Sequence, residues 1–333
     1  MSACVAIAGV TGAVGQEFLQ VLEQRGFQAD RYKMLASARS AGREVSFNGT
    51  TYAVEEMTPE SFADVDIALF SCGGSQSKQF APLAARQDCV VVDNSSAFRM
   101  DPKVPLVVPE INADAIRDHE GIIANPNCST IIMAVPVFPL HQAFGVKRMV
   151  VSTYQAVSGA GAQAMEELKT QTQATLNGEE VEPVKFKYPC AFNVFSHDSD
   201  LQENGYNTEE MKMVHETHKI FSDDSIGVTC TCIRVPVLRA HCESINLEFN
   251  QSVDLDEVID VLLRAPGVSL IDDRENNRFP MPLDATDEDD VYVGRIRYDE
   301  SIPNNRAINL WVAGDQIRKG AALNAVQIAE KLL

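Results

Sequence analysis

A glycine-rich turn close to the N-terminus restricts the fold of this chain more than any other feature. The run VAIAGVTGAVGQEFLQVL is strand-like, then turns at Gly9, Gly12 and Gly15, and then continues as an amphipathic helix. Glycines at this spacing let the backbone approach a pyrophosphate, and the helix N-terminus supplies N–H groups and a partial positive charge. Because the turn follows a strand and opens a helix, it predicts a dinucleotide-binding fold rather than a simple tight turn.

The order of strand-like and helix-like segments predicts two domains. Strands and helices alternate through the first third, as in CVAIAGV, GQEFLQVLEQRG and RYKMLASA, which is the pattern of parallel βαβ units. From about Val146 longer strands such as KRMVVSTYQAV and ESINLEFN follow, separated by helices and long loops. We therefore predict the α/β class, with a Rossmann-like dinucleotide-binding domain over residues 1–127, completed by a C-terminal helix over 315–333. A second, α+β catalytic and dimerisation domain is predicted over 128–314. Its strands would carry helices on one side and leave the other free, so a sheet-to-sheet contact between subunits is expected.

The charge of the chain argues against several partners. Its 28 Lys and Arg against 47 Asp and Glu give a net charge of −19, so binding to nucleic acid or to an anionic membrane is not expected. Neither a run of about 18 apolar residues nor a basic leader occurs, so no membrane span or signal peptide is indicated and a cytoplasmic location is expected. Any anionic ligand must be held by a few local cations. The acidic run Asp284–Asp290 is expected to be a solvated loop.

The eight cysteines are scattered without a CxxC pair, so we expect reduced, mostly buried thiols and no metal site. Cys128 has a distinct context, because IIANPNCSTIIM places it between an Asn-Pro-Asn turn and the start of an apolar helix. A thiol at a helix N-terminus has its pKa lowered towards the reactive thiolate. Asn127 can add an amide donor towards a developing oxyanion.

The end of the second strand bears on the choice of cofactor. An acidic residue that would bind ribose hydroxyls is replaced here by SARSAG, with Ser37, Arg39 and Ser40. Hydroxyls and a guanidinium suit a 2′-phosphate, so NADP is favoured over NAD. The alternative is that Arg39 is one exposed surface arginine. The expected cofactor-binding residues in this part of the chain are Gly9, Thr11, Gly12, Ala13, Val14, Gly15, Ser37, Arg39 and Ser40.

Several motifs together resemble one enzyme family along essentially the whole chain. They are AGVTGAVGQE, DNSSAFR, VPEIN, NPNCST, YQAVSGAG, EEMKMVHET and RVPVLRAHCESINLEF, and with them the chain resembles aspartate-semialdehyde dehydrogenases of the bacterial type. The resemblance implies NADP and a reaction of L-aspartyl-4-phosphate to L-aspartate 4-semialdehyde and phosphate through a cysteine thioacyl intermediate. It places that reaction in the synthesis of lysine, diaminopimelate, threonine and methionine, and it suggests a homodimer joined through the second domain.

The resemblance also assigns roles to individual residues. Cys128 would be the nucleophile and His241 the group that exchanges its proton. Arg234 matches the arginine that pairs with the substrate's α-carboxylate, and Arg99 matches the main phosphate contact. The remaining matches are Glu209 for the amino group, Lys212 for phosphate, Asn127 and Gln155 for substrate, and Ser158, Gly159 and Asn324 for the nicotinamide end of the cofactor. Arg234 and His241 are seven residues apart, so a bend at Pro236 is needed to bring them to one face.

Particular residues argue against the alternative functions of this chain. An N-acetyl-glutamyl-phosphate reductase shares the architecture, but an acylated amine needs no acid such as Glu209. A glyceraldehyde-phosphate dehydrogenase would carry Ser-Cys-Thr-Thr-Asn, which is absent. A catalytically silent paralogue that only binds or assembles would not need Cys128, His241, Arg99 and Arg234 together. Without the resemblance, Glu209 and Lys212 would be an exposed helix ion pair. Ordinary surface or packing roles are expected for the other histidines, which are His119, His141, His197, His215 and His218.

Overall fold

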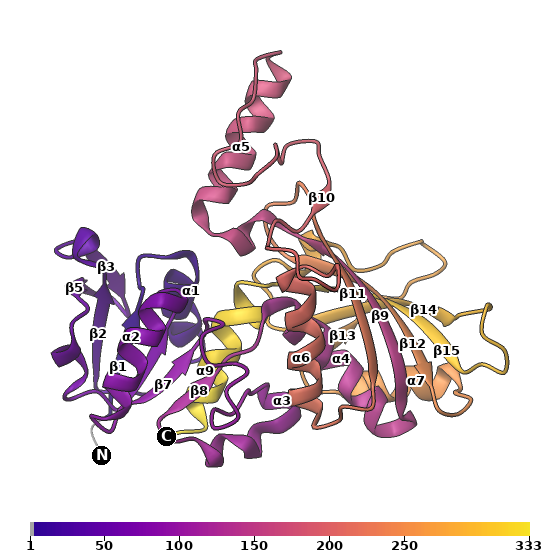
Figure 1. The fold of residues 1–333 in the computed structure, drawn as a ribbon, viewed down its shortest axis with the longest axis horizontal. Helices are drawn as coiled ribbons and strands as arrows, with labels where there is room; N and C mark the ends of the chain where they lie inside the picture. Colours follow the sequence, from indigo (N-terminus) through magenta and orange to yellow (C-terminus); the bar gives the residue numbers. More distant parts are fainter. Residues whose placement is uncertain (1–2) are drawn as a thin grey trace. The chain divides into compact units, whose positions relative to one another are not determined.

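The computed structural model describes residues 3–333 and divides the chain into two compact units, each with its own large sheet (Figure 1). The first unit extends to Asn127 and includes Ala321–Leu333, and the second is Cys128–Gly320. Residues 315–320, which the sequence analysis assigned to the first domain, therefore belong to the second unit. The reason is that the buried Asp315 carboxylate accepts hydrogen bonds from Arg239 Nε at 2.6 Å and from the Asp287 N–H at 2.8 Å. Within the described residues, no helix is long and apolar enough to cross a membrane.

The first unit is built on a parallel sheet of six strands in the order β5-β2-β1-β6-β7-β8. The strands are β1 (Cys4–Ala8), β2 (Arg31–Ala36), β5 (Glu55–Glu56), β6 (Ile67–Phe70), β7 (Val90–Asp93) and β8 (Ile122–Ala124). The unit also contains α1 (Ala13–Gln24), α2 (Gly74–Ala85), α3 (Pro109–Asn112), α9 (Leu323–Glu330) and a hairpin of β3 (Glu44–Phe47) and β4 (Thr50–Ala53). All residues of β1 and β6 are buried, as is typical of parallel strands covered on both faces. The predicted Rossmann-like fold is confirmed.

The C-terminal helix α9 completes the apolar core of the first unit. Leu323 and Val326 belong to the same buried cluster as Phe18 of α1, and Arg25 forms an ion pair with Glu330 at 2.6 Å. Burial of a large apolar side chain stabilises a fold by about 1.5–3 kcal/mol. This packing holds α9 in the first unit although the whole second unit intervenes in the sequence.

The second unit is built on a mixed sheet of seven strands in the order β10-β11-β9-β12-β15-β14-β13. The strands are β9 (Val146–Gln155), β10 (Phe195–Ser196), β11 (Gly227–Arg234), β12 (His241–Phe249), β13 (Val268–Leu270), β14 (Val291–Tyr298) and β15 (Ala307–Gly314). The helices are α4 (Cys128–Phe144), α5 (Ala162–Leu176), α6 (Thr208–Phe221), α7 (Leu255–Arg264) and α8 (Pro282–Ala285). Long strands mixed with helices confirm the predicted α+β character.

The two faces of this sheet differ in burial. Helix α4 contacts β9, β12, β14 and β15, and α6 contacts β11. On β9 the side chains of Val151 and Thr153 are fully buried, whereas the intervening Ser152 and Tyr154 are only partly buried. One face therefore packs on helices, and the other remains partly exposed in a single chain.

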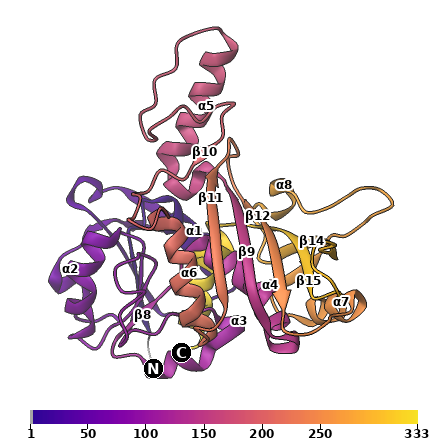
Figure 2. The same ribbon diagram turned by 45° about the vertical axis from the view of Figure 1, so that its right-hand side comes forward.

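An arm extends from the β10–β11 edge of the sheet and consists of α5 and the segment that returns alongside it (Figures 1 and 2). Leu168 of α5 and Phe186 of the returning segment lie in one small buried cluster. Val184 and Phe192, in contrast, are 88% and 66% exposed. The arm thus has a small core of its own and exposes apolar side chains on its outer surface.

The acidic run Asp284–Asp290 is not simply a solvated loop, as the sequence analysis expected. Asp287 pairs with Arg239 at 2.7 Å, and Asp289 pairs with Arg318 at 2.5 Å. The run starts in α8, and its backbone is tied to Asp315 through the Asp287 N–H. The carboxylates therefore partly neutralise two arginines of the second unit.

Candidate active site

Cys128 is the first residue of α4, and its thiol faces a histidine. The distance from Cys128 Sγ to His241 Nε2 is 3.7 Å, and His241 is the first residue of β12. Pro126 disfavours a helical conformation at the residue before it, so the helix starts only after the Asn-Pro-Asn turn. The side chain of Cys128 thus lies at a helix N-terminus, where the backbone N–H groups and the helix dipole stabilise a thiolate.

The proton on His241 can be placed from its hydrogen bonds. The backbone N–H of Ala156 donates to His241 Nδ1 at 3.0 Å, so the neutral ring carries its proton on Nε2, the atom that faces Cys128. Complete burial, followed by the nearby charge of Arg234, holds the pKa of His241 well below its usual value. The ring is therefore neutral at pH 7, and its Nε2–H can donate a hydrogen bond to an anion beside Cys128.

His241 and Arg234 converge although β9 lies between their strands. A Cβ atom on Gly159 would lie 3.3 Å from His241 Cε1 and 3.6 Å from Arg234 Nη1. Strand β11 ends at Arg234 and β12 begins at His241, so the segment that contains Pro236 is the bend that their odd spacing requires. On the thiol side, a Cβ atom on Gly320 would lie only 2.8 Å from Cys128 Cβ. Glycines at 159 and 320 therefore leave the space that surrounds the thiol, the imidazole and the guanidinium.

Arg234 is buried and held in a fixed orientation. Its Nη1 donates to the Ala156 carbonyl at 2.8 Å, and its Nη2 donates to His197 Nε2 at 2.9 Å. The guanidinium carbon lies 5.5 Å from the centre of the Phe186 ring. Its Nε is buried and forms no hydrogen bond with the residues that the structure describes.

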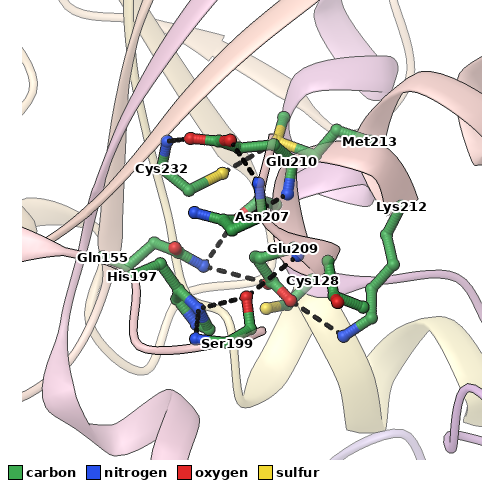
Figure 3. A network of polar contacts seen from close by, with 12 residues as sticks. Cys128, Gln155, His197, Ser199, Asn207, Glu209, Glu210, Lys212, Met213 and Cys232 are labelled. Atoms are coloured by element: carbon green, nitrogen blue, oxygen red, sulfur yellow. Dashed lines mark hydrogen bonds and ion pairs between the residues drawn. The ribbon is translucent and has the colours of Figure 1, made fainter. Parts of the chain in front are cut away.

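Glu209 and Lys212 form an ion pair at 2.9 Å in the first turns of α6, but the pair is not the exposed one that spacing alone suggests. Glu209 is 5% exposed, and its Oε1 accepts a hydrogen bond from Gln155 Nε2 at 3.2 Å. The same nitrogen donates to Ser129 Oγ at 3.0 Å, one residue after the cysteine. Figure 3 shows how Gln155, Glu209 and Lys212 join in one polar network.

His197 is a member of this network that the sequence analysis missed, because it expected an ordinary role for this residue. Strand β10 pairs antiparallel with β11, with Phe195 opposite Arg234, and this pairing brings the following His197 to Arg234. On its other side, His197 Nδ1 lies 3.1 Å from Ser199 Oγ, which accepts from the Glu209 N–H at 3.1 Å (Figure 3). Only a prediction of the short β10 strand would have revealed this contact.

Two further expected substrate residues, Arg99 and Asn127, lie buried in the first unit. Arg99 Nε donates to the Asn125 carbonyl at 2.9 Å, and its Nη2 donates to the Asn94 carbonyl at 2.8 Å. Asn324 of α9 is fully buried and donates to Asn125 Oδ1 at 2.7 Å. These polar groups form a connected cluster around the carboxyl end of β8.

The first unit also contains a cavity of about 470 Å³ at the glycine-rich turn. Gly9, Thr11, Gly12 and Ser37 line it, together with residues of α2. A Cβ atom on Gly9 would lie 2.3 Å from the Ser71 carbonyl oxygen, so only glycine fits where β1 ends. Of the other expected residues, Ala13, Val14 and Gly15 begin α1, Ser40 is buried with its hydroxyl 3.4 Å from that of Thr11, and Arg39 is exposed after β2. This cradle has the chemistry that a dinucleotide pyrophosphate requires.

No group of three or more His, Cys, Asp or Glu side chains among residues 3–333 could hold a metal ion.

Comparison with known proteins gives the same division of the chain. A family model described as the NAD binding domain of semialdehyde dehydrogenase matches residues 4–119, and one described as its dimerisation domain matches residues 137–319. Aspartate-semialdehyde dehydrogenase from a Synechocystis species is 54% identical over 99% of this chain and 97% of its own, and that from Prochlorococcus marinus is 51% identical over 99% and 95%. The crystal structure of aspartate semialdehyde dehydrogenase II from Vibrio cholerae, complexed with ASA, has a TM-score of 0.96 and 46% identity, and the match covers 100% of this chain and 98% of that one.

The fold and the matched domains define the class as a two-domain semialdehyde dehydrogenase with a nucleotide-binding domain. Within that class, the chain belongs to the aspartate-semialdehyde dehydrogenase family, whose members are oxidoreductases of amino-acid biosynthesis.

Proposed function

We propose that the protein catalyses the NADP-dependent reductive dephosphorylation of L-aspartyl-4-phosphate to L-aspartate 4-semialdehyde, through a thioacyl intermediate on Cys128. The observation that carries this proposal is the position of Cys128 at the start of α4 with the Nε2 proton of His241 directed at it across 3.7 Å. Family membership supports the reaction, which serves lysine, diaminopimelate, threonine and methionine synthesis.

The proposed steps use the thiol and the imidazole in turn. The Cys128 thiolate attacks the acyl carbon, the carbon–oxygen bond to phosphate breaks, and a thioester remains. NADPH supplies a hydride to this carbon when it is bound. His241 then donates a hydrogen bond from its Nε2–H to the resulting alkoxide and stabilises the negative charge. The alkoxide re-forms the carbonyl as the carbon–sulfur bond breaks, which releases the aldehyde and restores the thiolate.

The charged groups of the second unit suit an amino-acid substrate. Arg234 offers donors to the α-carboxylate, and the buried carboxylate of Glu209 offers an acceptor to the ammonium group. This acid favours a free amine over the acylated amine of an N-acetyl-glutamyl substrate. Lys212 and Arg99 are proposed to bind phosphate, while Asn127 and Gln155 are proposed to orient the substrate.

The cofactor assignment rests on the cradle at Gly9 and on the residues after β2. Ser37, Arg39 and Ser40 are proposed to bind the 2′-phosphate, which is the basis for NADP over NAD. Ser158, Gly159 and Asn324 are proposed to contact the nicotinamide end.

Assembly and location complete the proposal. The partly exposed face of the seven-stranded sheet and the exposed apolar side chains of the arm support a homodimer, in agreement with the matched dimerisation domain. The eight cysteines, which lie within the described residues, are in no disulfide, so we place the enzyme in the reducing cytoplasm. The net charge of −19 disfavours nucleic acid and membrane as partners.

The decisive experiment combines turnover with labelling of the nucleophile. We expect wild-type protein to reduce NADP with aspartate semialdehyde and phosphate, and Cys128→Ala to lose activity at least 10³-fold, by analogy with loss of other catalytic nucleophiles, while it retains its fold. Mass spectrometry should find a substrate-derived adduct at position 128. Cys89→Ala is the control, because burial raises the pKa of the Cys89 thiol to about 12 and makes it unreactive. An adduct at another cysteine, or full activity of Cys128→Ala, would contradict the mechanism.

A further inference from the structure

His197 lies between the two charged groups that are proposed to bind the amino-acid part of the substrate. Its Nε2 lies 2.9 Å from Arg234 Nη2. Its Nδ1 lies 3.1 Å from Ser199 Oγ, which accepts from the Glu209 N–H at 3.1 Å (Figure 3). We infer that His197 is a positioning residue that orients Arg234 towards the α-carboxylate, and that protonation of its imidazole weakens substrate binding. This inference rests on the proposed role of Arg234.

The hydrogen bonds determine which form of His197 fits. A guanidinium can only donate, so His197 Nε2 must be an unprotonated acceptor and the neutral ring carries its proton on Nδ1. Nδ1 then donates to Ser199 Oγ, and the longer approach of the Ser199 N–H to Nδ1, at 3.3 Å, is not a hydrogen bond in this tautomer. The neutral imidazole of His197 and the hydroxyl of Ser199 thereby connect the charged Arg234 to the first turn of α6.

The contact with His197 is one of three contacts that hold the guanidinium of Arg234 in position. The Ala156 carbonyl holds Nη1, His197 holds Nη2, and the Phe186 ring lies beside the guanidinium. With both terminal nitrogens held, the plane of the guanidinium is set, and Nε has a defined direction. A fixed plane matters because bidentate binding of a carboxylate requires two aligned N–H groups.

Charged groups from three elements act on His197. Burial lowers its pKa most, Arg234 of β11 and Lys212 of α6 lower it further, and Glu209 of α6 and the adjacent Asp198 raise it, with a net pKa below the ordinary 6.5. The fully buried His241 of β12 also interacts with it. His197 is therefore neutral at pH 7. As pH falls through its lowered pKa, the ring gains a proton on Nε2, loses the acceptor for Arg234 and places a second positive charge beside it.

Two substitutions separate the hydrogen bond from the titration. In His197→Gln the side-chain amide can accept from Arg234 and donate to Ser199 but does not titrate, whereas His197→Leu removes both contacts. We expect the wild-type KM for aspartate semialdehyde to rise as the pH falls below about 6.5. His197→Gln should lack this rise, and its KM at pH 8 should stay within about 3-fold of the wild-type value. His197→Leu should raise that KM roughly 10-fold at every pH, as for loss of one hydrogen bond to a charged group, with the KM for phosphate unchanged.

Controls and a binding measurement make the result specific. His215→Gln alters an exposed histidine of α6, the helix that carries Glu209, and should keep the acid-side rise. Calorimetry of aspartate semialdehyde with Cys128→Ala protein, with and without His197→Leu, measures affinity without turnover. The inference is overturned if His197→Gln keeps the wild-type pH profile, or if His197→Leu binds aspartate semialdehyde as tightly as its parent. Arg234→Lys, measured in parallel, tests the proposed function separately, because an unchanged affinity there would remove Arg234 from the carboxylate site whatever His197 does.

Discussion

At the scale of single residues, two buried polar atoms of the proposed substrate site have no hydrogen-bond partner in the described part of the chain. Arg234 Nε and Gln155 Oε1 are buried and form no hydrogen bond with any residue in the range 3–333. A buried polar atom without a partner costs about 1–3 kcal/mol, and a ligand that pairs with it removes that cost. One atom is a donor and the other an acceptor, which suits the carboxylate and the ammonium of an α-amino acid.

Arg39 is the residue on which the cofactor prediction depends. It is exposed on the turn after β2, next to Ser37 of the cavity. Arg39→Ala should weaken NADP binding by about 10-fold or more, as for loss of a charge-assisted hydrogen bond, and should leave NAD binding nearly unchanged. Fluorescence titration of both cofactors measures this directly, with Arg43→Ala as a nearby exposed control. Equal changes for NAD and NADP would show that Arg39 does not read the 2′-phosphate.

At the scale of elements, helix starts place the charged side chains of the second unit. Helix α6 begins with a capping box, in which Asn207 Oδ1 accepts from the Glu210 N–H at 2.9 Å and the Asn207 N–H donates to the Glu210 carboxylate at 2.8 Å. Glu209 lies within this first turn. The cap therefore sets both the stability of the helix and the position of the acid.

Removal of the cap should affect stability and substrate binding together. Asn207→Ala is expected to lower the free energy of unfolding by about 1 kcal/mol, a shift of roughly 2–4 °C in the Tm of a unit of this size, and to raise the KM for aspartate semialdehyde. Asp254→Ala is the matched control, because Asp254 caps α7 by accepting from the Asp256 N–H at 2.9 Å, and α7 carries no expected site residue. Thermal unfolding and steady-state kinetics of both variants check this. A KM change in the control as large as that in Asn207→Ala would mean that general destabilisation is responsible.

At the scale of the whole molecule, the second unit combines the thiol site with the proposed subunit contact. The helix-covered face of its sheet carries Thr153, Gln155 and Arg234, while Ser152 and Ser244 occupy the partly exposed face and are paired across β9 and β12. The proposed substrate site and the proposed subunit contact thus lie on opposite faces of the same strands.

A charge placed on the partly exposed face should therefore separate the subunits. Ser244→Arg is expected to shift the protein from twice the mass of one chain to the mass of a single chain, because a desolvated charge without a partner costs several kcal/mol at an interface. Light scattering after size exclusion measures the mass. Leu263→Arg places the same charge on an exposed position of α7, where Leu263 is 62% exposed, and should leave the mass unchanged. A dimeric Ser244→Arg protein would place the subunit contact elsewhere.

The sequence by itself determined the features that depend only on residues close together in the chain. The glycine turn, the βαβ alternation and the start of a helix at Cys128 follow from backbone sterics and short-range periodicity, and all are present in the structure. The motifs also pointed to the family that the comparisons establish. Each of these signals lies within one segment of the chain, so it can be read without knowledge of the fold.

Only the tertiary structure decided which distant residues meet. His197 reaches Arg234 because a two-residue strand pairs with β11, and Arg234 meets His241 across an intervening strand. The acidic run 284–290 is tied to Arg239 and Arg318, and residues 315–320 stay with the second unit, because of ion pairs and hydrogen bonds to Asp315 and its neighbours. Such contacts depend on strand order and register, which arise from packing over the whole unit and leave no periodic signal in the local sequence.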